Sequence, residues 1–238
     1  DSISVLMSVY NCSAYLQQSL DSLLNQTFQD FELIIIDDAS TDETPSILHK
    51  YANKDPRINY LRNEQNLGLA PSLNRGLEIC HGNLVARADG DDVYALDRLE
   101  KQIHFMNLHP EVGVSSTSFS TIDENGRTLR THQVPLHDRH LKFFLPFGHE
   151  IIHSSCIYRR HLVLGVEGYD EAFTPGPEDY DLWARLVRRT NFANLPESLI
   201  KIRIRPSSVT KCGDGGFWEQ SYSISRRLLS EYLGFQVK

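Results

Sequence analysis

Short apolar runs alternate with amphipathic stretches through the first half of the chain. Residues 3–9 and 31–36 are rich in β-branched side chains and almost continuously apolar, which is typical of strands buried on both faces of a parallel sheet. Between them, residues 13–26 carry leucines at helical spacing, and Ser13 stands where an N-terminal cap is expected. The pattern predicts a strand–helix–strand unit at the start of the chain.

The same alternation continues to about residue 110. A Ser-Thr-Asp-Glu capping box at 40–43 predicts a second helix. The elements expected after it are a strand at 58–61, a helix at 70–80, a strand at 84–88 and a helix at 94–108 that Pro110 ends. Such alternation favours a doubly wound, mostly parallel α/β sheet flanked by helices, which binds its ligand at the carboxyl ends of the strands.

The second half of the chain is less regular. Asn125-Gly126 predicts a hairpin between strands at 118–122 and 127–131. The other expected elements are a strand at 150–158 and helices at 179–189 and 218–233. Because no linker composition divides the chain, we predict a single domain over residues 1–215, with halves of about 1–110 and 111–215, followed by a C-terminal helix within 216–238.

Composition excludes some classes of function. A formal net charge of -7 argues against broad affinity for nucleic acid, which needs a basic surface to displace counterions. The cysteines form no Cys-x-x-Cys pair, so we expect no zinc site and free thiols in a reducing compartment. They are Cys12, Cys80, Cys156 and Cys212. No signal peptide and no apolar stretch of about 18 residues is evident, so we expect a soluble cytoplasmic protein.

Two acidic clusters directly follow predicted strands. They are Asp37-Asp38 and the stretch Asp89-Gly90-Asp91-Asp92. Carboxylates gathered at one edge of a sheet repel one another and need a cation, and magnesium or manganese held by carboxylates commonly bridges to phosphate oxygens. We therefore expect a metal–diphosphate site, with Asp37 in a structural role. The alternative is that Asp91 and Asp92 cap the following helix while Asp89 faces solvent.

Other phosphate-binding folds fit the sequence less well. The first strand is followed by Val-Tyr-Asn-Cys-Ser-Ala instead of the glycine-rich turn of a dinucleotide-binding fold, and a P-loop motif is also absent. A phosphoacceptor receiver domain places its paired acids after the first strand, and such a domain is about half as long as this chain.

The sequence resembles the family-2 glycosyltransferases of GT-A fold, including inverting bacterial enzymes that build surface polysaccharides. The matching blocks are "VLMSVYN", "LLNQTFQDFELIIIDDASTDET", "NLGLAPSLNRGL", "ARADGDDVYALDRL", "HSSCIYRR" and "PEDYDLWARL". They extend over roughly residues 3 to 210, and the first four in this order are highly specific together. The resemblance implies a nucleotide-sugar-binding first half and an acceptor-binding second half.

On the donor side, the resemblance implies roles for residues within the first three blocks. Ser8 and Tyr10 match positions beside the nucleotide, and Tyr10 would stack on the base. Asp38 matches an acid that accepts a hydrogen bond from the uracil imide, which implies a UDP-sugar donor, or less probably a dTDP-sugar. Asn66 and Gly68 match a loop that passes near the base.

The resemblance also implies the residues that handle diphosphate and acceptor. Asp89 matches an acid near the ribose, Asp91 matches the ligand of a divalent metal, manganese or magnesium, and both are candidates for metal ligation. Asp179 matches the catalytic base, with Glu178 beside it. His153 matches a polar position facing the reaction centre. Each has an alternative: His153 as an ordinary structural histidine, and Glu178 and Asp179 as acids favoured by a helix N-terminus.

One position departs from the family pattern. Many relatives carry a histidine in an Arg-x-His-x-x-Ser motif near the end of the catalytic region, where it helps to hold metal or diphosphate. This chain has "IRIRPSSVT", with Arg205 in that place. Arginine cannot ligate a metal but can pair with diphosphate.

The implied reaction is inverting transfer of a sugar to the hydroxyl of a saccharide or lipid-linked saccharide. The alternatives are a polyprenyl-phosphate glycosyltransferase of the same fold and a nucleotide-sugar-binding module without catalysis. A lipid-linked acceptor would place the protein at the inner face of a membrane, for which Arg226-Arg227 in the last predicted helix is slight support.

Overall fold

The computed structural model describes residues 2–173, 176–205 and 215–234. The elements of the first half are β1 (Ile3–Val9), α1 (Ser13–Leu24), β2 (Phe31–Asp37), α2 (Thr44–Ala52), β3 (Ile58–Arg62), α3 (Leu69–Ile79), β4 (Leu84–Asp89), β5 (Val93–Tyr94) and α4 (Arg98–Leu108). Those of the second half are β6 (Val112–Ile122), β7 (Thr128–His132), α5 (Asp138–Phe144), η1 (His153–Ser155), β8 (Ile157–Arg159), α6 (Arg160–Leu164), α7 (Glu178–Leu186), β9 (Asn191–Arg203) and α9 (Gly215–Leu233).

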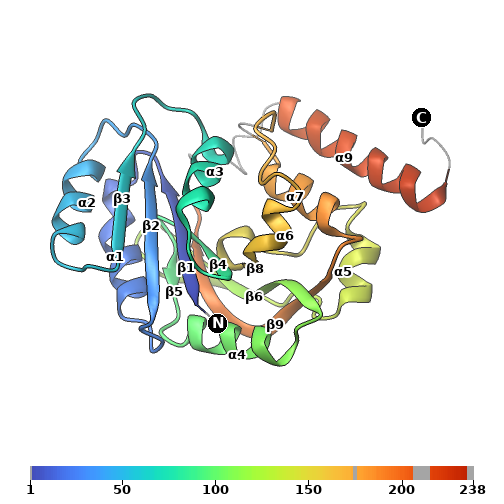
Figure 1. Cartoon of the computed structure of the whole chain (residues 1–238), viewed down its shortest axis with the longest axis horizontal. Coiled ribbons are helices and arrows are strands. Elements are labelled where there is room, and N and C mark those ends of the chain that lie inside the picture. The colour runs from blue at the N-terminus through green and yellow to red at the C-terminus, as the bar shows by residue number, and fades with distance from the viewer. Residues whose placement is uncertain (1, 174–175, 206–214, 235–238) are drawn as a thin grey trace.

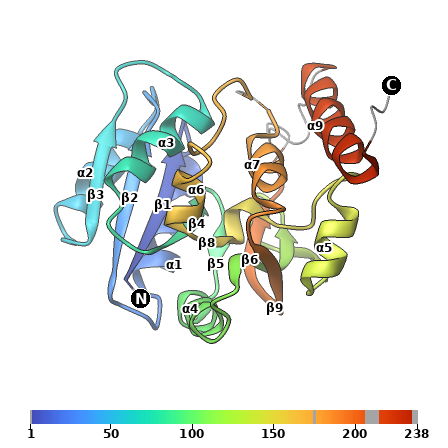
Figure 2. The same cartoon turned by 45° about the vertical axis from the view of Figure 1, so that its right-hand side comes forward.

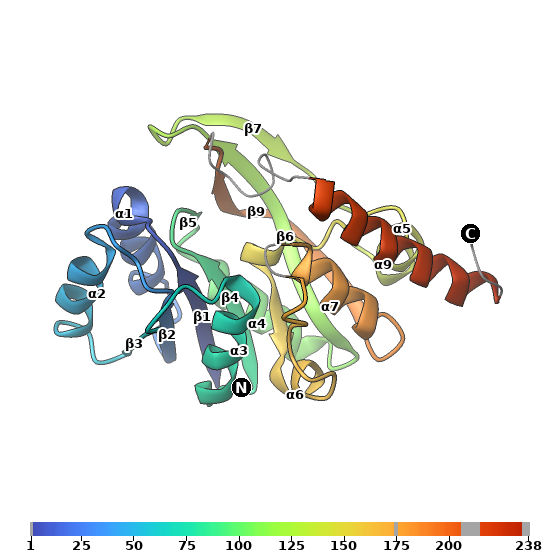
Figure 3. The same ribbon diagram turned by 90° about the horizontal axis from the view of Figure 1, so that it is seen from above.

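The described strands form one continuous sheet that joins both halves of the chain. Their order is β3-β2-β1-β4-β8-β6-β9-β5, with β7 paired to β6. β1 to β4 are parallel, and so are β6 and β9, whereas β5, β7 and β8 are antiparallel to their neighbours. The sheet curves, so that β6, β7 and β9 run at an angle to β1 and β2 (Figure 3). The predicted α/β class with a mostly parallel sheet is confirmed.

Apolar side chains of alternating strand positions fill two cores, one on each face of the sheet. Leu6 and Ile34 pack with α3, α6, α7 and α9, while Val5 and Leu33 pack with α1, α2 and α4. This explains the almost continuous apolar runs of β1 and β2, because both strands are covered by helices on both faces. Figures 1 and 2 show these helix layers on either side of the sheet.

Two elements differ from the sequence prediction. The expected strand at 150–158 is wrong: His153–Ser155 is a 3-10 turn and only Ile157–Arg159 is a strand. The helix expected from residue 94 begins at Arg98, because Tyr94 is held in an antiparallel pair with Ile200 of β9.

The structure also contains a long strand that the sequence pattern did not predict. β9 covers Asn191–Arg203 and contains Pro196, which cannot donate to a strand ladder. The pairing with β6 shifts register between Thr117 and Ser118, whose partners are Leu195 and Ser198. Pro196 therefore lies in a bulge, where its missing N–H is tolerated.

The described cysteines are buried free thiols, as expected. These are Cys12, Cys80 and Cys156. Cys212 lies in 206–214, outside the described residues. That segment also contains most of the boundary between the predicted domain and the last helix, so the boundary stays a prediction.

Candidate active site

The parallel strands bring the donor-side candidates to one edge of the sheet. At the carboxyl end of β1, Ser8 is level with Asp89 of β4, and Val9 is level with Asp37 of β2. Asp38 follows directly. The sheet edge therefore holds the acidic residues together, as parallel strand ends require.

Asp38 is buried and anchors the loop that precedes α3. Its Oδ1 accepts hydrogen bonds from Asn63 Nδ2 at 2.7 Å and from the Leu67 amide at 2.8 Å, and its Oδ2 accepts one from the Gly68 amide at 2.8 Å. A carboxylate has about four acceptor positions. One position therefore remains for another donor, such as the N–H of a base.

The other donor-side candidates border Asp38. Tyr10 lies just after β1 and is 50% exposed, so a face of its ring is available for stacking. Asn66 is exposed in the loop that Asp38 anchors, and Ser8 is half-buried. Gly68 begins α3 with φ 92°, a conformation that favours glycine.

Asp37 has the structural role expected for it. It is fully buried, its Oδ1 accepts from the Ser40 amide at 2.9 Å, and its Oδ2 lies 3.2 Å from the Tyr60 hydroxyl and 3.4 Å from Arg62 Nε. These contacts fix the turn after β2 and direct Asp38 toward the ligand edge.

The stretch Asp89–Asp92 is held tightly against β1. A Cβ on Gly90 would lie 2.8 Å from Val9 Cγ1 and 2.9 Å from Cys12 Sγ, so only glycine allows the backbone to approach this closely. Asp92 is buried and its Oδ1 accepts from the Arg203 amide at 3.0 Å. Asp92 is thus a structural acid that ties the stretch to β9.

Asp89 and Asp91 each pair with an arginine. Asp89 Oδ1 lies 2.6 Å from Arg87 Nη2, and Asp91 Oδ2 lies 2.6 Å from Arg205 Nη2. Burial, and then the charge on Asp89, raise the pKa of Asp91. The alternative of helix capping is wrong, because β5 separates these residues from α4, whose N-cap is Asp97.

These acids fit part of a metal site. Within the described residues no three His, Cys, Asp or Glu side chains gather as a metal cluster. Magnesium and manganese are often held by one or two carboxylates, with phosphate oxygens and water completing the sphere. Asp89 and Asp91 supply such carboxylates, and a cation beside them would relieve their repulsion.

Arg87 is a site residue that the sequence analysis overlooked. It is fully buried at the end of β4 and donates to the Ala88 carbonyl as well as to Asp89. Its charge also contributes to lowering the pKa of His153. A charged residue inside an apolar strand was the signal that could have identified it.

Asp179 and Glu178 lie in the first turn of α7, where the helix dipole favours negative charge. Asp179 Oδ1 accepts from the Tyr180 amide at 2.7 Å, and its Oδ2 lies 3.5 Å from His149 Nε2. Burial, and then the charge on Asp179, raise the pKa of Glu178 well above its ordinary value. The raised pKa favours the protonated form of Glu178.

His153 lies in η1 beside Glu178. Its Nδ1 is 3.6 Å from Glu178 Oε1, and its Nε2 lies 2.9 Å from the Tyr169 hydroxyl. Burial, with smaller contributions from the charges of Arg87 and His149, lowers its pKa well below the ordinary value. The neutral form of His153 is thus favoured, and its ring lies between the Tyr169 hydroxyl and the Glu178 carboxyl.

His149 is a second residue that sequence reasoning missed. Its Nδ1 lies 3.1 Å from the Ile151 carbonyl, which directs Nε2 toward Asp179. It stands in an irregular segment between α5 and η1, where no periodic pattern marks it.

β9 brings two arginines to the acidic stretch. Arg203 is buried, lies over the Tyr15 ring at 4.4 Å and donates to the Asp91 carbonyl at 3.0 Å. Arg205 has a side chain that is 25% exposed and pairs with Asp91. Of these two, Arg205 is the one that an anionic ligand can reach.

The chain belongs to glycosyl transferase family 2, whose family model matches residues 4–164. It is 35% identical over 237 residues to the amylovoran biosynthesis glycosyltransferase AmsE of Erwinia amylovora, covering 98% of this chain and 88% of that protein. It is 33% identical over 242 residues to the O-antigen biosynthesis glycosyltransferase WbnJ of Escherichia coli, covering 98% and 93%.

Solved structures agree on the GT-A fold. A TarS fragment from S. aureus in complex with UDP-GlcNAc matches with a TM-score of 0.79 at 22% identity, over 100% of this chain and 68% of that one. The mannosyltransferase PcManGT from Pyrobaculum calidifontis, in complex with GDP-Man and Mn2+, matches with a TM-score of 0.67 at 16% identity, over 99% and 76%. The chain is therefore a glycosyltransferase of family 2 with this fold.

Proposed function

We propose that this glycosyltransferase is an inverting enzyme that moves a sugar from a UDP-sugar to the hydroxyl of a saccharide or lipid-linked saccharide. The process served would be the synthesis of a polysaccharide, lipopolysaccharide or glycoconjugate, in the cytoplasm or at the inner face of the membrane. The observation that supports this most strongly is the position of Asp38, Asp89 and Asp91 at one sheet edge, with Asp179 on α7 beyond Arg87. The names of AmsE and WbnJ agree with such a process.

The mechanism follows from the needs of sugar transfer. Asp179 accepts the proton of the acceptor hydroxyl as that oxygen attacks the anomeric carbon. Asp38 and Tyr10 hold the base. Arg205 leaves its ion pair with Asp91 and pairs with the diphosphate of the departing UDP, which gains negative charge. A divalent ion on Asp91 and Asp89 would supply Lewis-acid stabilisation of the leaving group. A single displacement needs only one base, unlike the paired carboxylates of glycoside hydrolases.

The donor base is assigned from Asp38, because the structural neighbours differ in theirs. TarS is in complex with UDP-GlcNAc and PcManGT with GDP-Man. UDP is expected to bind far more tightly than GDP, ADP or CDP. Asp38→Ala should weaken UDP binding by about 1 to 3 kcal/mol, the contribution of a hydrogen bond to a charged group. Isothermal titration calorimetry measures the preference for UDP and the loss of affinity in the variant.

Asp38 also anchors the following loop, so the experiment needs a matched control. Asn63→Ala removes one of the anchoring hydrogen bonds and leaves the carboxylate in place. Its UDP affinity should stay close to that of the wild type. Equal affinity for GDP and UDP, or an equal loss in Asn63→Ala, would contradict the assignment of Asp38 to the uracil.

Inversion is tested by the stereochemistry of the product. An α-linked UDP-sugar should give a β linkage, because a single displacement attacks from the face opposite to UDP. The anomeric proton coupling in an NMR spectrum of the product distinguishes the two linkages. A retained α linkage would exclude Asp179 as the base of a single displacement.

Two alternatives predict other outcomes. A polyprenyl-phosphate glycosyltransferase attacks through a phosphate and needs no strong base, so it would tolerate loss of Asp179. A nucleotide-sugar-binding module would bind UDP-sugars but would not hydrolyse them, whereas the proposed enzyme should hydrolyse them slowly when no acceptor is present. A screen of nucleotide sugars by thermal shift with manganese, followed by a hydrolysis assay on the best ligand, separates the binding module from the proposed enzyme. The activity of the Asp179→Asn variant separates the polyprenyl-phosphate glycosyltransferase.

A further inference from the structure

Three phenylalanines are exposed on α5 and the turn after it. α5 buries Leu141, whereas Phe143, Phe144 and Phe147 are 66%, 48% and 72% exposed. The rings of Phe143 and Phe144 meet edge to face, 5.1 Å apart. Three large apolar side chains within five positions cost free energy in water and mark a contact surface. We refer to these three residues as the aromatic patch.

A basic cavity lies beside the aromatic patch. It has a volume of about 420 Å³, and Glu111 is the one acid in its lining. Its basic lining residues are Lys142, Arg159, His161, Arg188 and Arg189. The hydrogen bonds of Arg159 and Arg189 go to backbone carbonyls, so their charges can act on an outside anion. Two other cations of the lining pair with acids: Lys142 Nζ lies 3.1 Å from Asp138 Oδ2, and Arg188 Nε lies 3.8 Å from Glu231 Oε2.

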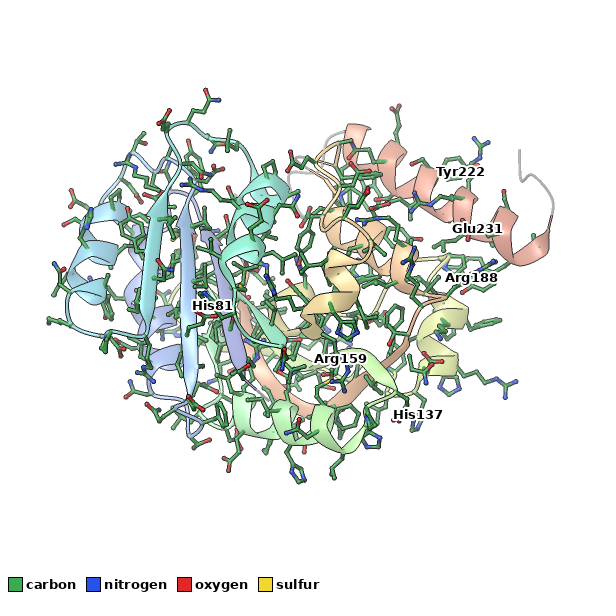
Figure 4. The ribbon with its side chains drawn as sticks, in the orientation of Figure 1. His81, His137, Arg159, Arg188, Tyr222 and Glu231 are labelled. Atoms are coloured by element: carbon green, nitrogen blue, oxygen red, sulfur yellow. The ribbon has the colours of Figure 1, made fainter. Side chains whose placement is uncertain are left out.

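The patch and the cavity belong to one surface, formed by α5, the end of α7 and α9. Lys142 lines the cavity and directly precedes Phe143, and its carbonyl accepts a hydrogen bond from the Tyr232 hydroxyl of α9 at 3.3 Å. Arg188 Nη2 donates to the Glu231 carbonyl at 2.9 Å, and the two labelled side chains lie close together in Figure 4.

This surface also continues toward the acceptor side of the active site. Phe147 stands two positions before His149, whose Nε2 is 3.5 Å from Asp179. The aromatic patch and the His149 contact to the candidate base therefore lie in one short segment of the chain.

We propose that this surface docks the protein on a bilayer that contains anionic phospholipid. The aromatic patch enters the interface between headgroups and acyl chains, and the cavity takes a phosphate-bearing headgroup. Exposed aromatic side chains beside Lys and Arg are the composition that binds such interfaces. The purpose of docking, delivery of a lipid-linked acceptor to Asp179, rests on the proposed function, whereas docking itself needs no turnover. No helix of the described residues is long and apolar enough to cross a membrane.

Vesicle sedimentation tests the proposal on the whole chain. The protein should pellet with vesicles of phosphatidylglycerol and phosphatidylcholine, and at least about tenfold less with phosphatidylcholine alone or at high salt. Replacing all three phenylalanines by Ser should reduce binding at least about tenfold, and so should the double change Arg188→Glu and Arg189→Glu. The matched control is Leu96→Ser with Leu129→Ser, which removes two exposed leucines outside α5, α7 and α9 and should leave binding unchanged.

Further measurements distinguish a bilayer from other ligands of this surface. Binding of inorganic phosphate, measured by calorimetry, by a protein that pellets with none of the vesicles would assign the cavity to free phosphate and overturn the docking role. A dimer, seen by light scattering, that the triple Ser variant loses would assign the patch to a second copy. Equal pelleting of wild type and triple variant would also contradict docking. Each variant should bind UDP as the wild type does, so a loss of docking is separable from a failure of the proposed function.

Discussion

Sugar transfer by the Asp179→Asn variant is expected to be about two to four orders of magnitude slower than that of the wild type, the usual contribution of a positioned general base. Asn keeps the shape of the side chain and can still accept from the Tyr180 amide, but it cannot take the proton of the acceptor hydroxyl. UDP affinity should hardly change, because the donor-side carboxylates stay in place. Initial rates of transfer and calorimetry with UDP measure the two effects separately.

Glu178→Gln is the matched control for this prediction. Burial, and then the charge on Asp179, raise the pKa of Glu178 well above its ordinary value. The protonated form of Glu178 is therefore favoured, and Gln imitates that form. Most of the activity should remain. If Glu178→Gln abolished transfer while Asp179→Asn did not, the two residues would exchange roles.

Asp181, the next acid on α7, is not an alternative base. It is fully buried and pairs with Arg185 at 2.6 Å and with Arg227 of α9 at 2.7 Å. Both of its oxygens are therefore occupied by structural partners. Arg227, which the sequence suggested as slight support for a membrane surface, helps instead to hold α9 against α7.

The first half of the fold was predictable because each of its elements carries its own periodicity. Strands such as Phe31–Asp37 are buried on both faces and read as apolar runs, and α1 shows leucines at helical spacing. In the second half, burial is achieved by small polar residues. β6 contains four serines and threonines in succession, at positions 115–118. They are buried, and hydrogen bonds such as Ser116 Oγ to Asn194 Oδ1 satisfy three of the four hydroxyls. Such pairings depend on distant residues, so no local pattern indicates them.

The candidate site was predictable where residues follow a strand end, and not where a contact comes from elsewhere. Asp38, Asp89 and Asp91 could be placed on one sheet edge from the parallel order of the strands. The pairing of Asp91 with Arg205 joins positions more than a hundred residues apart, and His149 reaches Asp179 from an irregular segment. These contacts depend on the three-dimensional path of β9 and of the segment after α5.

A divalent ion bound by Asp91 would compete with Arg205 for the same carboxylate. In the structure, Asp91 Oδ2 pairs with Arg205 Nη2 at 2.6 Å. Binding of a metal with diphosphate would free Arg205 to pair with phosphate oxygens, so that both cations act on the leaving group. The raised pKa of Asp91, caused by burial and then by Asp89, indicates a carboxylate that a further cation would stabilise in its charged form.

Removing divalent metal with EDTA is therefore expected to lower transfer by about two orders of magnitude or more, because Lewis-acid stabilisation contributes several kcal/mol. UDP affinity should fall as well, and manganese or magnesium should restore both. Asp91→Asn should remove most of this metal dependence. Asp97→Asn, which changes an exposed acid paired with Lys101, is the control and should behave as the wild type. If UDP binding and transfer were the same with EDTA and with manganese, Arg205 would be the main counter-charge of the diphosphate, and Asp89 and Asp91 would serve to position it and the ribose.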